Sequence, residues 1–416
     1  MKKQVLIISF VFPPYPGIGG RRWAKFSKYL IELETEVFVL ASENPFSTTS
    51  EWTKDIENSN VKRLPLKYPK ALITFPKSFS GRINYKISKF FVQVFSKGNY
   101  YDKALFWQNQ LLNEARKIIE LHDIKNVVIS GAPFHLMHHG LTLKDWNTNL
   151  NLIVDFRDLW TDDVSMSALS SMSQRRLNVE SKMELEVLNK ADCVITVSDF
   201  MTKKLHQKTN VRKAITIING FDEHDFGSVK NTNNSDDFFN FVFTGSLYKN
   251  IDSVFTPFCE AVQKIKINEP DLYGKLNFNF YGTSDVSNIE LVKKMNLDCI
   301  HFHDSISLNH VFEKISRADY CMLFLNDTYS FSLSTKFCEY IGLRKSIVLF
   351  SKEGDASSFI TSNKLGFWIN PHNMYEDLVR LLKTKDTISI DQNFELNREK
   401  YSLKNITKEL IESVLI

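Results

Sequence analysis

Short apolar runs alternate with segments of helical periodicity along the whole chain. Five such runs occur in the first half: QVLIISFVF, EVFVLA, NVVIS, NLIVDF and DCVITVS. A continuous apolar run of this length predicts a strand covered on both faces, and its alternation with helical patterns is typical of βαβ units. The first half therefore predicts an α/β fold with a parallel sheet.

The same rhythm restarts beyond a polar, asparagine-rich interruption, NTNNSDD, with NFVFTG, LNFNFYG, CIHFH, DYCMLFL and KSIVLF. We therefore expect two Rossmann-like, doubly wound parallel-sheet domains, over residues 1–225 and 238–399, joined by a linker over residues 226–237. Residues 400–416 predict a terminal amphipathic helix, because their leucines and isoleucines fall near one face.

Composition places the chain among ordinary globular proteins. Of its 416 residues, 43% are hydrophobic and 24% are charged, which excludes disordered and fibrous classes. Five cysteines without a Cys-x-x-Cys pair favour reduced thiols in a cytoplasmic protein over a zinc site or a disulfide framework. Two lysines before the first apolar run imitate a signal peptide, but two prolines follow at once, so we interpret this run as a buried strand. No stretch is long and apolar enough to predict a membrane span.

The net charge of +4 is unevenly distributed. Residues 1–229 carry 31 basic and 24 acidic side chains, and the remainder carries 21 and 24. Such asymmetry favours an anionic partner for the first half, either a nucleic acid or a lipid surface. A nucleic acid is disfavoured, because the basic residues do not belong to a recognised base-reading module.

A glycine-rich turn follows the first predicted strand, in FPPYPGIGGRRW. Gly19 and Gly20 precede a predicted helix, whose free N–H groups suit an anion. The sequence departs from a dinucleotide fingerprint, since Arg22 occupies the third glycine position. An ordinary tight turn and a phosphate or substrate loop both remain open.

Charged residues also follow two later strands. LIVDFRDLW places Asp158 at the carboxyl end of a strand, where ligands of open α/β sheets bind, although an internal Asp and Arg ion pair is the alternative. SGAPFHLMHHG places His135 after another strand. Its three histidines lack the spacing and carboxylate of a zinc helix, so a polar pocket or a helix N-terminus is favoured over a metal.

In the second half, TGSLYKNID places Gly245, Ser246 and Lys249 after a strand. FSLSTKFCEYIGLRKSIV starts a helix whose first turns carry further polar side chains: Ser334, Thr335, Lys336 and Glu339. Hydroxyls and free N–H groups suit a diphosphate, a lysine supplies a point charge, and a carboxylate can accept hydrogen bonds from a ribose diol. Taken singly, each of these features more often reflects helix capping or a solvated charge than a function.

The succession of these motifs resembles the retaining nucleotide-sugar glycosyltransferases of family four, over nearly the whole chain. The residues that carry it are FPPYPGIGG, DFRDLW, ADCVITVS, NGFD, TGSLYKNID and STKFCEYIGLRKSIV. The resemblance implies the GT-B fold, in which two Rossmann-like domains face each other across a cleft, the second holds the nucleotide sugar, the first holds the acceptor, and the last helix crosses back to the first domain.

The resemblance also assigns roles to the motif residues. Glu339 would bind the ribose and Lys249 the diphosphate, with Gly245 and Ser246 beside it. Ser334, Thr335 and Lys336 would adjoin the donor phosphates, and Gly19 and Gly20 would close over the donor. The chain departs from the family at two positions: Phe331 replaces a common glutamate, and Ser246 stands where an arginine is common.

The implied reaction transfers a sugar from a UDP- or GDP-linked donor to a glycan or a polyprenyl-diphosphate-linked acceptor, as in surface polysaccharide synthesis. Lys249 and the helix start at Ser334 would stabilise the departing diphosphate, so neither a metal nor a cofactor is expected. Asp158 and His135 would position the acceptor or handle its proton. The alternatives are a sugar-nucleotide epimerase of the same fold and a non-catalytic nucleotide-sugar binding protein.

Basic residues concentrate in residues 61–103, which contain ten lysines or arginines and one acidic residue. Within it, residues 77–97 place Phe90 and Phe91 on an apolar helical stripe bordered by Arg82, Lys86 and Lys89. This pattern suits a helix lying on anionic lipid, or a core-facing helix with solvated lysines. Given the family resemblance, we expect salt-sensitive peripheral association with the inner face of the cell membrane.

Overall fold

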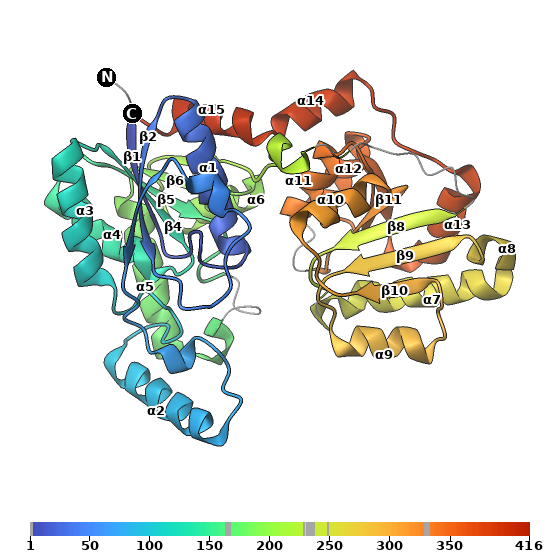
Figure 1. Ribbon diagram of the computed structural model, residues 1–416, viewed down its shortest axis with the longest axis horizontal. Helices are drawn as coiled ribbons and strands as arrows, with labels where there is room; N and C mark the ends of the chain where they lie inside the picture. The colour runs from blue at the N-terminus through green and yellow to red at the C-terminus, as the bar shows by residue number, and fades with distance from the viewer. Residues whose placement is uncertain (1–2, 163–167, 228, 230–237, 248, 328–332) are drawn as a thin grey trace. The chain divides into compact units, whose positions relative to one another are not determined.

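The computed structural model describes residues 3–416 except 163–167, 228, 230–237, 248 and 328–332. It divides into two units, one made of Met1–Ile218 and Ile406–Ile416 and the other of Asn219–Asn405. Each unit is built around one parallel β-sheet with helices on both faces (Figure 1).

The described sheet of the first unit runs in the order β3-β2-β1-β4-β5-β6-β7, with all neighbours parallel. Its strands are β1 (Gln4–Ser9), β2 (Glu36–Ser42), β3 (Asn60–Leu64), β4 (Asn126–Gly131), β5 (Asn151–Phe156), β6 (Cys193–Thr196) and β7 (Ala214–Thr216). Its helices are α1 (Arg21–Glu32), α2 (Phe79–Phe95), α3 (Gln108–His122), α4 (His135–Trp146), α5 (Gln174–Lys190) and α6 (Asp199–Lys208). The central strands β4 and β5 are buried at every position, as their continuous apolar runs predict.

The described sheet of the second unit runs in the order β10-β9-β8-β11-β12-β13, again all parallel. Its strands are β8 (Phe239–Thr244), β9 (Leu276–Tyr281), β10 (Ile300–His303), β11 (Tyr320–Phe324), β12 (Ser346–Phe350) and β13 (Gly366–Ile369). Its helices are α7 (Asp252–Asn268), α8 (Pro270–Tyr273), α9 (Val286–Lys294), α10 (Leu308–Ser316), α11 (Thr335–Gly342), α12 (Asp355–Ser362), α13 (Met374–Thr384) and α14 (Gln392–Lys400).

Phenylalanine dominates the core of the second unit. Phe324 and Phe350 stack at 4.7 Å between ring centroids, and Phe258 meets Phe278 edge to face at 5.0 Å. Such pairs add about 0.5–1.5 kcal/mol each beyond the area they bury. Phe258 of α7 also meets Phe324 of β11 and Phe350 of β12, so these contacts fix α7 across β9, β11 and β12.

Both sheets reverse their direction of winding beside their first strand, between β1 and β4 and between β8 and β11. Ligands of open α/β sheets bind at such a switch point, outside the carboxyl ends of the strands. The glycine turn and His135 follow β1 and β4, and Gly245 and α11 follow β8 and β11. Chain topology thus brings the motifs of each half to the switch point of its own unit.

The boundary between the units lies a few residues earlier than the sequence suggested, since residues 219–225 belong to the second unit. The N–H of Phe221 donates to the carbonyl of Tyr401 at 2.9 Å, and its ring stacks on Phe226 at 5.8 Å. Gly342 lies so close to both rings that a Cβ there would stand 2.6–2.7 Å from them. Aromatic packing on α11 therefore holds this segment in the second unit.

The last helix, α15 (Leu403–Ser413), leads the chain back to the first unit. Asn126 and Asn151, at the amino ends of β4 and β5, donate to the carbonyls of Ile416 and Val414 at 3.0 and 2.9 Å. The predicted return of the C-terminal helix to the first domain is confirmed. None of the described helices is long and apolar enough to cross a bilayer.

Candidate functional site

Two glycine turns shape the switch point of the second unit. Gly245 follows β8 with φ of +105°, and Gly282 follows β9 with φ of +129°, a region that L side chains rarely adopt. A Cβ on Gly282 would lie 2.5 Å from the carbonyl oxygen of Gly245. The N–H of Gly245 donates to the carbonyl of Tyr281 at 2.8 Å. Glycine at both positions therefore lets the two turns pack backbone to backbone.

Lys336, in the first turn of α11, reaches back to this turn. A Cβ on Gly245 would stand 2.6 Å from its Cε and 3.0 Å from its Nζ, and the Nζ lies 4.3 Å from the ring centroid of Phe243. Burial lowers the pKa of Lys336 to about 8, while the nearby charge of Glu339 partly opposes this shift. The structure thus brings three predicted donor residues, Gly245, Lys336 and Glu339, into one group.

The start of α11 carries the other predicted donor residues. Ser334 occupies the N-cap position with an extended backbone, and its side chain makes no capping hydrogen bond in the described structure. Thr335 begins the helix, and both residues are half-buried. Glu339 is 9% exposed, one turn further along the same helix.

The remaining predicted residues of the second unit are only partly described. Ser246 is half-buried beside Gly245. Lys249 begins the short 3-10 turn η6 (Lys249–Ile251), and its side chain is not among those that the structure describes. Phe331, the first departure from the family pattern, also falls outside the described residues.

In the first unit, Gly19 and Gly20 form the turn η1 (Ile18–Gly20) before α1. A Cβ on Gly20 would lie 3.2 Å from Cδ of Pro13. Arg157 donates to the carbonyl of Gly19, and also to those of Gly131 and Ala132 at 2.5 and 3.0 Å. One guanidinium therefore ties the turn after β1 to the loop after β4, which gives this turn a structural role whatever it binds.

A buried Asp and Arg ion pair of the kind considered for β5 exists, between Asp155 and Arg22. Asp155 is fully buried and lies 3.3 Å from Nε of Arg22 in α1. Its second oxygen accepts from the indole of Trp23 at 2.7 Å and from Ser130 at 2.9 Å. Asp158, by contrast, is exposed just beyond the end of β5. Asp155 thus holds α1 to the sheet, and Asp158 alone of the two faces solvent.

His135 begins α4 and is almost fully buried. Its Nε2 lies 2.7 Å from Oε1 of Glu180, and its backbone N–H donates to Asp102 at 3.0 Å. These two carboxylates hold the pKa of His135 above its usual value against burial, and hydrogen bonds from His135, Asn99 and Trp160 hold the pKa of Glu180 low. The arrangement stabilises an imidazolium at this position. The sequence gives no sign of either carboxylate partner, because both lie far from His135 along the chain.

The neighbouring histidines have separate partners. His138 lies 2.9 Å from Glu186, and His139 lies 3.0 Å from the carbonyl of Ala104, with burial lowering the pKa of His139 to about 4. Among the described residues, no group of three possible metal ligands includes a histidine.

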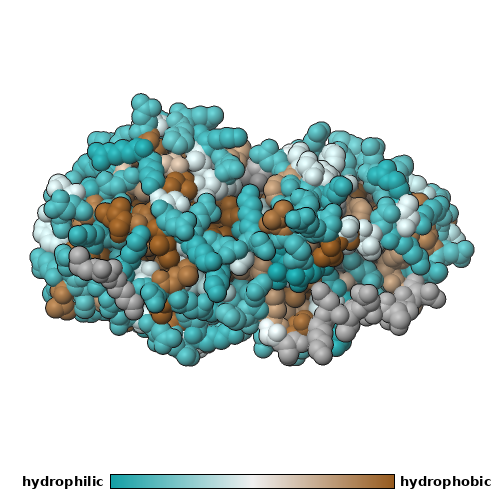
Figure 2. All heavy atoms as spheres, turned by 90° about the horizontal axis from the view of Figure 1, so that it is seen from above, coloured by the Kyte–Doolittle hydropathy of each residue, from teal (hydrophilic) through white to brown (hydrophobic). Residues whose placement is uncertain are grey.

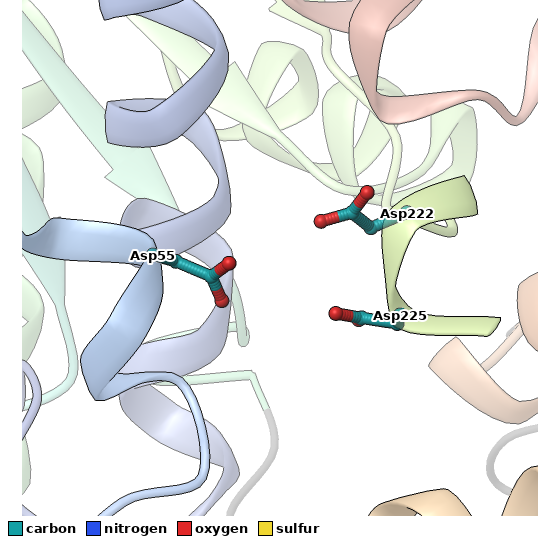
Figure 3. A group of neighbouring side chains, drawn as sticks. All are labelled: Asp55, Asp222 and Asp225. Atoms are coloured by element: carbon teal, nitrogen blue, oxygen red, sulfur yellow. The ribbon is translucent and has the colours of Figure 1, made fainter. Parts of the chain in front are cut away.

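Three carboxylates, Asp55, Asp222 and Asp225, are drawn in Figure 3. Asp55 belongs to the first unit, where the ammonium of Lys25 lies 2.9 Å away. Asp222 and Asp225 belong to the second unit, where Asp222 caps a 3-10 turn by accepting from the N–H of His224 at 3.0 Å. The three residues therefore make no metal site within either unit.

The apolar stripe of α2 is exposed in the structure. Phe79, Ile87 and Phe90 are 80%, 63% and 69% exposed, and Phe91 is 52% exposed. The opposite side of the helix packs on the unit through Val92, which is fully buried. On the face of the molecule drawn in Figure 2, patches of hydrophobic residues also emerge among hydrophilic ones. The stripe therefore does not face the core.

The three basic residues beside this stripe differ in how exposed their side chains are. Arg82 and Lys86 are exposed. Lys89 instead packs over the rings of Tyr100 and Tyr101, at 5.5 and 5.3 Å from their centroids. Two of the three predicted basic contacts are therefore available at the surface, and the third supports the helix.

Comparison with known proteins establishes the fold. No protein-family model and no curated protein matches the chain. Among solved structures, the trehalose-6-phosphate protein from E. coli bound with UDP-2-fluoro glucose is 10% identical, with a TM-score of 0.65 over 99% of both chains. WaaG, a glycosyltransferase involved in lipopolysaccharide biosynthesis, is 11% identical, with a TM-score of 0.53 over 98% of this chain and 95% of its own.

A structure described as a putative UDP-N-acetylglucosamine 2-epimerase from Listeria monocytogenes is also similar. It is 10% identical, with a TM-score of 0.54 over 100% of this chain and 96% of its own. Together with the two doubly wound parallel sheets, these matches confirm the predicted GT-B fold. Since glycosyltransferases and an epimerase share it, the fold alone does not select the reaction.

Proposed function

We propose that the protein is a metal-independent, retaining glycosyltransferase that uses a nucleoside-diphosphate sugar. The observation that supports this most is the group at the second switch point, where Lys336 lies against the Gly245 turn and Glu339 follows one helical turn later. A cation and a carboxylate at this spacing suit the diphosphate and the ribose of one donor. The helix start at Ser334 and Thr335 adds free N–H groups.

In this proposal each unit has one task. The second unit binds a UDP- or GDP-linked sugar, with Lys249 and Ser246 beside the phosphates. The first unit binds the acceptor. Exposed Asp158 positions the acceptor, and His135, kept protonated by its carboxylate partners, handles a proton or fixes the loop after β4. Gly19 and Gly20 approach the donor from the first unit.

The acceptor is proposed to be lipid-linked, as in surface polysaccharide synthesis. The exposed stripe of α2, with Arg82 and Lys86 beside it and no acidic residue within residues 77–97, suits peripheral binding to an anionic membrane. A polyprenyl-diphosphate carrier would then present the acceptor at that surface.

The deciding experiment incubates the protein with radiolabelled UDP- and GDP-sugars, with and without a polyprenyl-diphosphate-linked acceptor, in EDTA. Transfer of label to the acceptor supports the proposal. Conversion of the donor into an isomeric sugar nucleotide without acceptor would establish the epimerase. Nucleotide binding without either product would establish the non-catalytic alternative, and a strict requirement for added metal would refute metal independence.

A further inference from the structure

Three charged side chains follow one another along one face of α5. Arg176, Glu180 and Glu184 are spaced four residues apart, so each lies one helical turn beyond the last. The two glutamates are 0% and 1% exposed. Burying a carboxylate costs free energy that its partners only partly return, so such a row is weak evidence for stability. What the row does is fix the geometry of the groups that it bonds, and these groups belong to separate segments of the first unit.

Arg176, the first member of the row, holds the C-terminal end of α2. Its guanidinium donates to the carbonyls of Gln93 and Gly98, both at 2.6 Å, and to that of Ser96 at 3.0 Å. It also lies over the ring of Tyr100, 5.3 Å from the centroid. Tyr100 belongs to a small apolar cluster separate from the main core of the unit, and α2 lies apart from the sheet (Figure 1). Arg176 is therefore a main attachment of α2.

Glu180, one turn further along, joins this attachment to the first switch point. Its Oε1 accepts from the N–H of Asn99 at 2.5 Å and lies 2.7 Å from Nε2 of His135. Its Oε2 accepts from the indole of Trp160 at 2.7 Å. Gly98 has no side chain where a Cβ would collide with Oε1, which lets the chain approach this closely. One carboxylate thus touches the chain that leaves α2, the start of α4 and the loop after β5.

Glu184, the last member, holds the same loop after β5. It accepts from the hydroxyl of Thr161 and from Nζ of Lys208, the latter at 2.6 Å. Lys208, at the end of α6, also pairs with Asp162 at 2.9 Å. Asp158, to which the proposed function gives the positioning of the acceptor, precedes Thr161 in this loop. The row therefore runs from the base of α2 to both segments that carry the proposed acceptor residues.

We propose that Arg176 and Glu180 are positioning residues that transmit membrane binding by α2 to the acceptor side of the first switch point. This inference rests on the proposed function, which places α2 on an anionic membrane. A membrane that binds α2 in its attached position suppresses the local openings in which α2 leaves the unit. Because Asn99 and His135 share Glu180, the loop after β4 opens less often as well. The acceptor segments are then most ordered at the membrane, where a lipid-linked acceptor is presented.

The test measures backbone amide exchange by mass spectrometry, with and without vesicles of phosphatidylglycerol and phosphatidylcholine. In the native protein, the vesicles should slow exchange by about tenfold or more in residues 79–95 and by about threefold or more in residues 99–104 and 132–140. Arg176→Met should keep the first effect and lose the second. Gly98→Ala should do the same through the other link, because its Cβ would displace the carboxylate of Glu180.

Arg175→Met is the matched control, because Arg175 is the exposed neighbour of Arg176 on the same helix. It should behave like the native protein. Both test variants should bind the vesicles within about twofold of the native protein, since the apolar stripe of α2 is unchanged.

Slowing confined to α2 in the native protein, or unchanged slowing of residues 99–104 and 132–140 in both variants, would overturn the inference. Loss of vesicle binding in both variants would overturn it too, because these contacts would then serve the fold of α2 itself. If the native protein does not bind the vesicles, the proposed membrane surface is refuted and the inference falls with it.

Discussion

Replacing Phe90 and Phe91 of α2 together by aspartate should strongly weaken binding to anionic vesicles. The two side chains are 69% and 52% exposed and stand on the side of the helix away from its buried Val92. Full burial of a phenylalanine contributes about 1.5–3 kcal/mol, so these exposed fractions correspond to about 2–3.5 kcal/mol of membrane binding. Partitioning should therefore fall by about thirtyfold to several hundredfold.

The electrostatic part of the same interaction is separable. Each basic side chain near an anionic surface contributes about 1 kcal/mol, so Arg82→Glu with Lys86→Glu should reduce binding to anionic vesicles by more than about thirtyfold. Binding to neutral vesicles should change little. Lys89→Glu is unsuitable for this comparison, because Lys89 packs on Tyr100 and Tyr101 and its loss would disturb the helix.

The assay is co-sedimentation with phosphatidylglycerol-containing and pure phosphatidylcholine vesicles at low and high salt. Leu121→Asp is the control, because Leu121 is 77% exposed at the end of α3, outside the basic segment. It should sediment like the native protein. Equal sedimentation with both vesicle types, or an unchanged result for the double aspartate variant, would refute the assignment of α2 to the membrane.

Three further predictions concern the interiors of the units. Glu339→Ala should remove most of the thermal stabilisation that the bound nucleotide gives, because a carboxylate that accepts from a ribose contributes about 1.5–3 kcal/mol per bond; a shift equal to that of the native protein would refute the ribose assignment. In urea unfolding, Glu180→Gln should destabilise the first unit by about 3 kcal/mol at pH 6 and by less at pH 9. The reason is that the pKa of its partner His135 is raised in the folded protein, so the pair stabilises the fold at low pH and loses this effect as His135 deprotonates. An equal loss at both pH values would contradict the charged pair. Gly282→Ala should cost about 1–3 kcal/mol, since its Cβ would meet the Gly245 carbonyl at 2.5 Å, whereas Gly274→Ala, with its nearest contact at 3.6 Å, should be nearly neutral.

Much of the architecture could be predicted from the order of residues. Continuous apolar runs identify strands covered on both faces, and the restart of the pattern after NTNNSDD separates two sheets. Because parallel strands place their carboxyl ends at one edge, glycine and charged motifs that follow strands are expected to gather there. Gly245, Lys336 and Glu339 are therefore expected at one edge of the second sheet from their places after strands alone.

Contacts between distant segments were decided only by the tertiary structure. The sequence paired the acid of DFRDLW with an unspecified arginine, whereas packing buries Asp155 against Arg22 and uses Arg157 to tie two loops. Periodicity marked the apolar stripe of α2 but left its direction open, because the same pattern suits a core face and a surface face. Whether a side chain is buried depends on what the fold places opposite it, and no described residue of its unit covers the stripe of α2. The fold also places Lys336 beside Gly245, where desolvation lowers its pKa, and no local pattern of residues determines this environment.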